Sequence, residues 1–174
     1  MELWDVYDID RNKTDRTMVR GDSFEEGDYH VVIHVCIFNK KGEMLIQQRQ
    51  PFKEGWPNMW DITVGGSAIM GDSSQSAAER ELFEELGIEM DLQGVRPNLT
   101  INFNNGFDDY YLVEKEVSLD SLTLQHEEVQ NAKWATEEEI LHMLKEETFI
   151  PYYESFIKLL FDIRKQYGCH QKKN

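Results

Sequence analysis

The sequence predicts a single α/β domain over residues 1–174, in which helices flank a mixed β-sheet. Apolar runs of strand length at 29–38 and 44–49, separated by a turn, indicate strands of a buried sheet. Apolar side chains recur at helical spacing in 78–86 and 153–164. A chain of this length with 40% hydrophobic residues suits one globular domain with its own core.

Composition narrows the possible partners. The formal net charge of −15 argues against a nucleic acid polymer, because such binding depends on clustered Lys and Arg. The amino-terminal segment has no apolar signal core, and no stretch approaches a membrane span. Cys36 and Cys169 form neither a disulfide framework nor a metal motif, which favours a reducing compartment. We therefore expect a cytoplasmic protein that binds neither nucleic acid nor membrane.

The first third of the chain is expected to be mainly extended. Residues 1–28 predict a short strand followed by a polar turn. His30 and His34 lie four residues apart on the next strand, and therefore on one face of the sheet. We interpret them as strand histidines with satisfied hydrogen bonds rather than as metal ligands. Pro, Gly and aromatic residues in 50–60 predict a loop, followed by a short strand at 61–64.

Turn and capping signals define the later elements. Asn104-Asn105-Gly106 predicts a tight turn between two strands. Thr136 and Glu139 have capping-box spacing at a helix start, and Pro151 is expected to open the last helix. The predicted elements of this half are strands at 95–104, 110–117 and 131–134, a polar connection at 119–129, and carboxy-terminal helices within 136–167.

The helix in the middle of the chain carries a group of acidic residues. It is expected to begin with Asp72 or Ser73 as N-cap and to end at Gly87. One face presents three glutamates at i, i+3 and i+4, namely Glu81, Glu84 and Glu85. Carboxylates at this spacing are neighbours that raise each other's pKa, so a hard divalent cation would stabilise them. The alternative for the glutamates alone is a solvated helix surface.

These glutamates belong to a longer pattern over residues 66–88. The segment reads Gly, five residues, Asp72, seven residues, and then Arg80 followed by Glu-Leu-Phe-Glu-Glu-Leu-Gly-Ile. This pattern resembles the Nudix box, in which the first acid is Glu rather than Asp. In this resemblance Gly66, Asp72 and Gly87 are structural positions of the box.

The resemblance implies a Nudix-type α/β/α sandwich and a pyrophosphohydrolase that cleaves a diphosphate linkage with Mg²⁺ or Mn²⁺. In such an enzyme, water activated by the ion attacks phosphorus. Arg80 would orient the glutamates and pair with Asp72. The implied metal ligands are Glu81, Glu84, Glu85 and the backbone carbonyl of Gly65. The implied catalytic residues are Arg80, Glu84 and Glu85, and the general base is either a box glutamate or one of Glu127 and Glu128.

The implied substrate is a small-molecule diphosphate. A nucleoside diphosphate derivative is the default within the family, and an isoprenyl diphosphate is the alternative. Arg49, Trp56 and Phe107 are candidate substrate-binding residues, since aromatic side chains can stack on a nucleobase or line an isoprenoid pocket. Both a monomer and a homodimer are compatible with the sequence.

Two alternative functions follow from the same residues. The chain also resembles isopentenyl diphosphate isomerases of the same superfamily, in a stretch that includes Trp56-Pro57-Asn58-Met59-Trp60. Those enzymes need Cys-Gly-His directly after the residue that matches Val64, where this chain has Gly65-Gly66-Ser67. Glycine donates no proton, which favours a hydrolase over an isomerase. A non-catalytic diphosphate binder would be expected to lose box glutamates, and here all three are present.

Overall fold

The computed structural model describes residues 2–171, which form a two-stranded hairpin and a seven-stranded sheet with three α-helices. The elements in chain order are β1 (Leu3–Tyr7), β2 (Lys13–Val19), β3 (His30–Phe38), β4 (Met44–Arg49), β5 (Trp60–Asp61), β6 (Val64–Ser67), α1 (Ser74–Leu86), β7 (Leu99–Phe103), β8 (Gly106–Glu114), the 3₁₀ turn η1 (Leu119–Ser121), β9 (Val129–Ala135), α2 (Glu137–Lys145) and α3 (Glu154–Ile163).

The seven-stranded sheet splits around its central strand. The main path is β5-β4-β3-β8-β7, with β3 and β8 parallel and the other neighbours antiparallel. β6 pairs with β3 over four residues, whereas β4 meets β3 only where Phe38 faces Met44. At the split, the Thr63 hydroxyl accepts from the backbone N–H of Ile37 at 2.9 Å and donates to the carbonyl of Leu45 at 2.5 Å. One side chain thereby joins the two halves.

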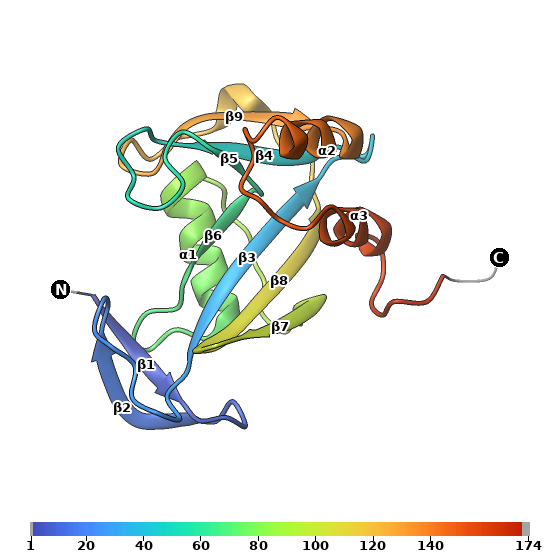
Figure 1. Cartoon of the computed structure of the whole chain (residues 1–174). Helices are drawn as coiled ribbons and strands as arrows, with labels where there is room; N and C mark the ends of the chain where they lie inside the picture. Colours follow the sequence, from blue (N-terminus) through green and yellow to red (C-terminus); the bar gives the residue numbers. More distant parts are fainter. Residues whose placement is uncertain (1, 172–174) are drawn as a thin grey trace.

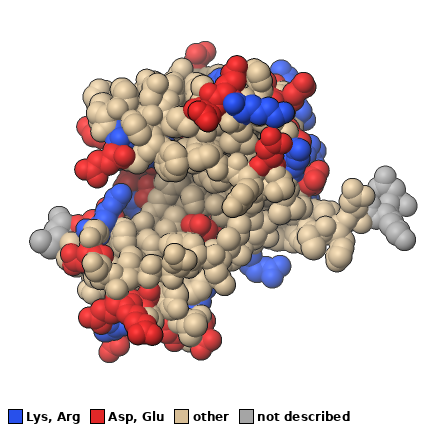
Figure 2. All heavy atoms as spheres, viewed as in Figure 1, with Lys and Arg blue, Asp and Glu red and all other residues tan. Residues whose placement is uncertain are grey.

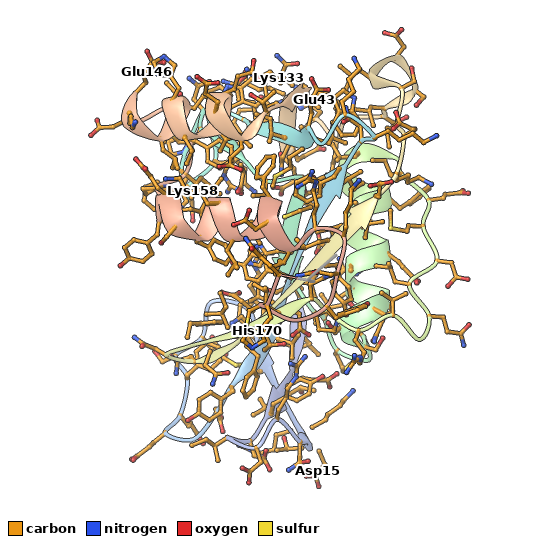
Figure 3. The ribbon with its side chains drawn as sticks, turned by 90° about the vertical axis from the view of Figure 1, so that its right-hand side faces the viewer. Asp15, Glu43, Lys133, Glu146, Lys158 and His170 are labelled. Carbon is orange, nitrogen blue, oxygen red and sulfur yellow. The ribbon has the colours of Figure 1, made fainter. Side chains whose placement is uncertain are left out.

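Helices cover both faces of this sheet, as predicted for an α/β/α sandwich (Figure 1). Alternate residues of β3 face opposite layers. Val35 packs in one core cluster with Leu82 of α1, whereas Cys36 packs in the other with Ile140 of α2 and Ile157 of α3. Figure 3 looks toward α2 and α3, which lie side by side on their face of the sheet.

Capping residues set the ends of the two polar helices where the sequence placed them. The Ser73 side chain accepts a hydrogen bond from the backbone N–H of Ser76, and the Ser76 hydroxyl accepts one from the backbone N–H of Ser73. Gly87 ends α1 in the left-handed region with φ of 69°, which glycine adopts without a steric cost. Thr136 and Glu139 form the predicted capping box of α2.

The start of the last helix and the outline of several strands differ from the predictions. The last helix begins at Glu154 rather than at Pro151, because extended backbone continues up to Ile150, whose N–H donates to the carbonyl of Trp60. The strand expected from residue 95 begins at Leu99, after Pro97, which has no N–H to donate.

Two strand boundaries and the amino-terminal segment also differ from the predictions. Residues 61–64 are divided between β5 and β6, because the sheet splits there. The strand expected at 110–117 runs from Gly106 to Glu114 and starts directly after the Asn104-Asn105 turn. The amino-terminal segment contains a second strand, β2, and its hairpin lies beside the sheet rather than within it (Figure 1).

Charged side chains are spread over the visible surface, and acidic and basic groups meet in a recess at the left of Figure 2. The recess lies between the amino-terminal hairpin and the upper part of the molecule (Figures 1 and 2). Within residues 2–171, every helix is too short or too polar to cross a membrane.

Candidate active site

The second half of α1 brings the three box glutamates to one cavity. Glu81, Glu84 and Glu85 line it together with the β6 residues Gly65 to Ser67. It has a volume of about 230 Å³, and we call it the glutamate cavity. The helical spacing explains the convergence, because side chains at i, i+3 and i+4 are neighbours on one face.

Arg80 is hydrogen-bonded to three acidic side chains of the box, those of Asp72, Glu81 and Glu84. Its guanidinium donates to Asp72 at 3.0 Å, to Glu81 at 2.8 Å, to Glu84 at 3.1 Å and to the carbonyl of Ser67 at 3.1 Å. Burial lowers the pKa of Arg80, but the charge of Glu81 and the hydrogen bond to Asp72 raise it by more than burial lowers it. The net pKa lies above the ordinary value, so the guanidinium stays protonated. The shorter side chain of Asp72 therefore still reaches its partner.

Glu85 is the most buried of the three glutamates, with 5% of its surface exposed. Its Oε2 accepts a hydrogen bond from Gln47 Nε2 at 3.0 Å. Burial raises the pKa of Glu85 well above its ordinary value, and the charges of Glu81 and Glu128 raise it further. Burial likewise raises the pKa of Glu81. A cation among these carboxylates would stabilise their ionised forms.

The residues of the cavity fit a hard divalent cation. Carboxylate and carbonyl oxygens are the ligands that such ions prefer, and several glutamates line the cavity. At Gly66 a Cβ atom would overlap the Glu81 carboxylate, so glycine leaves the space that this carboxylate occupies. Within residues 2–171, no three His, Cys, Asp or Glu side chains are already gathered into a metal-binding group. Arg80 instead bonds to Glu81 and Glu84 in this structure.

Of the two candidate acids outside the box, the structure places one at the cavity. Glu128 lines the glutamate cavity, and its Oε2 pairs with Nζ of Lys53 at 2.5 Å. Glu127 is exposed and does not line it. Lys53 comes from the loop before β5 and was not predicted. The cavity thus contains a carboxylate, that of Glu128, which does not belong to α1 and is paired with the ammonium group of Lys53.

Comparison with known proteins agrees with this geometry. A family model described as the NUDIX domain matches residues 28–159. The chain belongs to the Nudix family. An uncharacterized Nudix hydrolase of Listeria monocytogenes is 48% identical to it over 98% of this chain and 99% of that protein. An isopentenyl-diphosphate Delta-isomerase of Salmonella arizonae is 28% identical, over 64% of each chain.

A solved structure also matches the fold. The crystal structure of a protein from Deinococcus radiodurans superposes with a TM-score of 0.72 at 20% identity, over 90% of this chain and 98% of that one. The predicted Nudix fold is therefore confirmed, and the chain is a Nudix hydrolase by family.

A second cavity adjoins the Nudix glutamate site on the α3 side of the sheet. It has a volume of about 300 Å³ and is lined by His34, Asp61, Tyr152 and Trp56, among others. We call it the adjoining cavity. Its lining overlaps that of the glutamate cavity at Arg20, Arg49 and Gly65 to Ser67. The two cavities therefore share these residues of β6 and two arginines as a common wall.

Gly65 and Gly66 lie between the two cavities, and neither has a side chain that would enter them. A Cβ at Gly66 would meet Glu81 on one face, and a Cβ at Gly65 would lie 2.7 Å from Nδ1 of His34 on the other. His34 is not fully satisfied, contrary to our interpretation. Its Nε2 lies 3.2 Å from Asp108 Oδ1, but its buried Nδ1 has no hydrogen-bond partner among the described residues. His30 Nδ1 is likewise unpartnered there.

The three candidate substrate-binding residues do not all lie at the cavities. Arg49 and Trp56 line the adjoining cavity. Phe107 does not, because it is buried on the α1 face, where it packs against Tyr29 and lies under the guanidinium of Arg11. The stacking role predicted for Phe107 does not fit this position. Neighbouring residues of a strand face opposite layers, and this alternation in β8 directs Phe107 to the α1 face.

Other residues of the two cavities gave no signal in the sequence. Arg20 is delivered by the end of the amino-terminal hairpin, and Asp61 and Tyr152 meet from segments 91 residues apart. Their placement depends on tertiary packing, for which a single sequence offers no local pattern. Only the crowding of Pro, Gly and aromatic residues around Trp56 indicated that this loop was unusual.

Proposed function

We propose that this chain is a Mg²⁺- or Mn²⁺-dependent Nudix hydrolase that cleaves the diphosphate linkage of a nucleoside diphosphate derivative or a related organic diphosphate. The observation that carries the proposal is the glutamate cavity, where Arg80 and Asp72 hold the box carboxylates beside cationic side chains. Glu81, Glu84, Glu85 and the carbonyl of Gly65 would hold the ion. When bound, it supplies positive charge against the diphosphate and lowers the pKa of water.

The protein side chains would perform the remaining tasks. Arg20, Arg49 and Lys53 line the cavity as cations that can bind the diphosphate oxygens. Arg80 orients Glu81 and Glu84 through its charge-assisted hydrogen bonds. Displacement at phosphorus needs little more than such positioning and charge stabilisation.

Glu128 is our choice for the general base. When a substrate phosphate takes over Lys53, the Glu128 carboxylate is free to accept the proton of the attacking water. The oxygen of that water forms the new bond to phosphorus, and the bridging oxygen of the diphosphate leaves with the second phosphate. A box glutamate is the alternative base.

An isomerase is disfavoured by the geometry at Gly65. The isomerase resemblance implies a cysteine at this position, but a Cβ there would lie 2.7 Å from His34 Nδ1. That separation is shorter than real Cβ contacts, so a proton-donating side chain at this position would require the His34 ring to shift. A non-catalytic binder is disfavoured because all three box glutamates remain and line the cavity.

The proposal is tested by a substrate panel. Phosphate or nucleoside monophosphate release would be measured from nucleoside diphosphate derivatives and isopentenyl diphosphate, with Mg²⁺, with Mn²⁺ and with chelator. We expect release that needs the ion and that Glu84→Gln lowers by about 10²-fold or more. Glu89→Gln is the matched control, because it removes the same charge from an exposed position outside both cavities. Double-bond migration in the isoprenoid without phosphate release would refute the proposal.

A further inference from the structure

The adjoining cavity contains a buried carboxyl group that the proposed hydrolysis does not use. Asp61 lies on β5 with 7% of its surface exposed. Its Oδ1 accepts from the backbone N–H of Ile62 at 2.8 Å and from the hydroxyl of Tyr152 at 3.0 Å. Its Oδ2 accepts no hydrogen bond from the described residues and is not a buried unpartnered atom, so it is open to the cavity. One oxygen is thus fixed by the protein, and the other is left for a ligand.

The environment of Asp61 disfavours its ionised form. Desolvation raises its pKa, and His34, the two hydrogen bonds and Arg49 offset only part of this effect. A ligand that donates a hydrogen bond to Oδ2 would stabilise the carboxylate.

The surroundings of Asp61 suit a flat ring. Trp56 lines the same cavity and is 51% exposed, so its indole is accessible for stacking. His34 stacks on Tyr110 with ring centroids 4.5 Å apart, which fixes the imidazole in the cavity wall. A planar heterocycle can therefore find an aromatic face and fixed polar groups together.

The cavity also lies at the right place for the part of a substrate beyond its diphosphate. Arg20 and Arg49 line both cavities, so phosphates bound by these cations would lie at the junction. A group attached to the phosphates then extends either into solvent or into the adjoining cavity. An isoprenoid chain placed there would remove water from the Asp61 carboxyl without donating a hydrogen bond to it, which is unfavourable.

We propose that Asp61 selects nucleobases that carry an exocyclic amino group. This inference rests on the proposed function, since it assigns the substrate of the same site. Adenine, guanine and cytosine each present an amino donor that the free Asp61 oxygen can accept. Uracil presents one ring N–H between two carbonyls, which would face the same carboxyl with repulsion. Tyr152 is the positioning residue, because its hydroxyl holds the other oxygen of Asp61.

The test compares bases on one enzyme before any variant is made. Rates of Mg²⁺-dependent cleavage would be measured for matched adenosine, guanosine, cytidine and uridine diphosphate derivatives. We expect kcat/KM for at least one amino-bearing base to exceed that for uridine by about 10-fold or more, as for one good polar base contact. Equal values for uridine and the other bases would overturn the inference while leaving the hydrolase intact.

A variant then assigns the preference to the carboxyl. Asp61→Asn keeps the shape but can donate to a uracil carbonyl, so the preference should shrink by about 10-fold or reverse. Asp162→Asn makes the same chemical change at an exposed position of α3 and should leave the preference unchanged. An unchanged preference in folded Asp61→Asn would also overturn the inference.

Binding separates the two levels of the proposal. If no nucleoside compound is cleaved, the nucleoside part of the proposed function fails. The affinities of AMP, GMP, CMP and UMP, measured by titration calorimetry, then decide the inference. Tighter binding of any of the three amino-bearing monophosphates than of UMP supports the selection by Asp61. Equal affinities, or no binding, overturn it.

Discussion

Replacing Glu85 with Gln should stabilise the metal-free protein and at the same time remove its response to metal. The carboxylate is buried, its pKa is raised by burial, and its one side-chain partner is the Gln47 amide. A glutamine has the same shape, and its amide oxygen can accept the same hydrogen bond. The substitution therefore removes a buried charge without opening a cavity.

The size of the effect follows from the burial. An ion that is buried without a counter-charge costs several kcal/mol in its charged form, and hydrogen bonding offsets part of this cost. We expect a gain of about 2 kcal/mol in the free energy of unfolding, or about 4–8 °C in Tm for a chain of this size. For the wild type, Mg²⁺ at about 100 times its Kd should add about 2.7 kcal/mol, and hence raise Tm by about 5–11 °C.

The assay is thermal unfolding followed by circular dichroism at neutral pH, with chelator and with Mg²⁺. Glu84→Gln is the matched control, since Glu84 is half-exposed and should lose the metal response without gaining metal-free stability. The pH dependence has a definite sign. A raised folded-state pKa destabilises the fold only where the unfolded side chain is ionised, so the advantage of Glu85→Gln should vanish below about pH 4.5 and grow above it.

Two results would refute this reasoning. A metal-free Glu85→Gln that melts below the wild type at neutral pH would mean that the carboxylate already has a compensating partner. A variant that keeps the full Mg²⁺ shift would mean that Glu85 is not a ligand.

Three further results are expected. Glu84→Gln should lower kcat by about 10²-fold or more, because one metal ligand is lost, and near-normal steady-state turnover would place the ion elsewhere. Arg80→Lys should weaken the Mg²⁺ affinity by about 10- to 100-fold, because an ammonium cannot bridge Asp72, Glu81 and Glu84 together; an unchanged affinity by calorimetry would contradict the orienting role. Gly65→Ala should lower the stability by about 1–3 kcal/mol through its clash with His34, and adding His34→Ala should restore part of it, whereas additive losses in denaturant unfolding would contradict the clash.

The sequence predicted the half of the site that is local in the chain. The spacing of Glu81, Glu84 and Glu85 places them on one helix face, and the box joins Arg80 to Asp72 over a distance that about two helical turns and a cap can span. Capping chemistry likewise located both ends of α1. These features depend on neighbouring residues, which is why a single sequence is enough to find them.

The other half depends on contacts that no local pattern specifies. Lys53 and Glu128 meet across 75 positions, and Arg20 reaches the cavity from a hairpin whose second strand was not expected. Phe107 was assigned to the substrate by residue type, but the register of β8 turns it into the core. The late start of α3 has the same origin, because pairing with β5 keeps the preceding backbone extended.

Hydrolysis in ¹⁸O-labelled water tests the central claim most directly. A nucleoside diphosphate derivative that the enzyme cleaves would be turned over in H₂¹⁸O with Mg²⁺, and the products analysed by mass spectrometry. Attack of water on phosphorus predicts one ¹⁸O per turnover in one of the two phosphate products and none with chelator. Turnover that places no ¹⁸O in either phosphate would contradict the account.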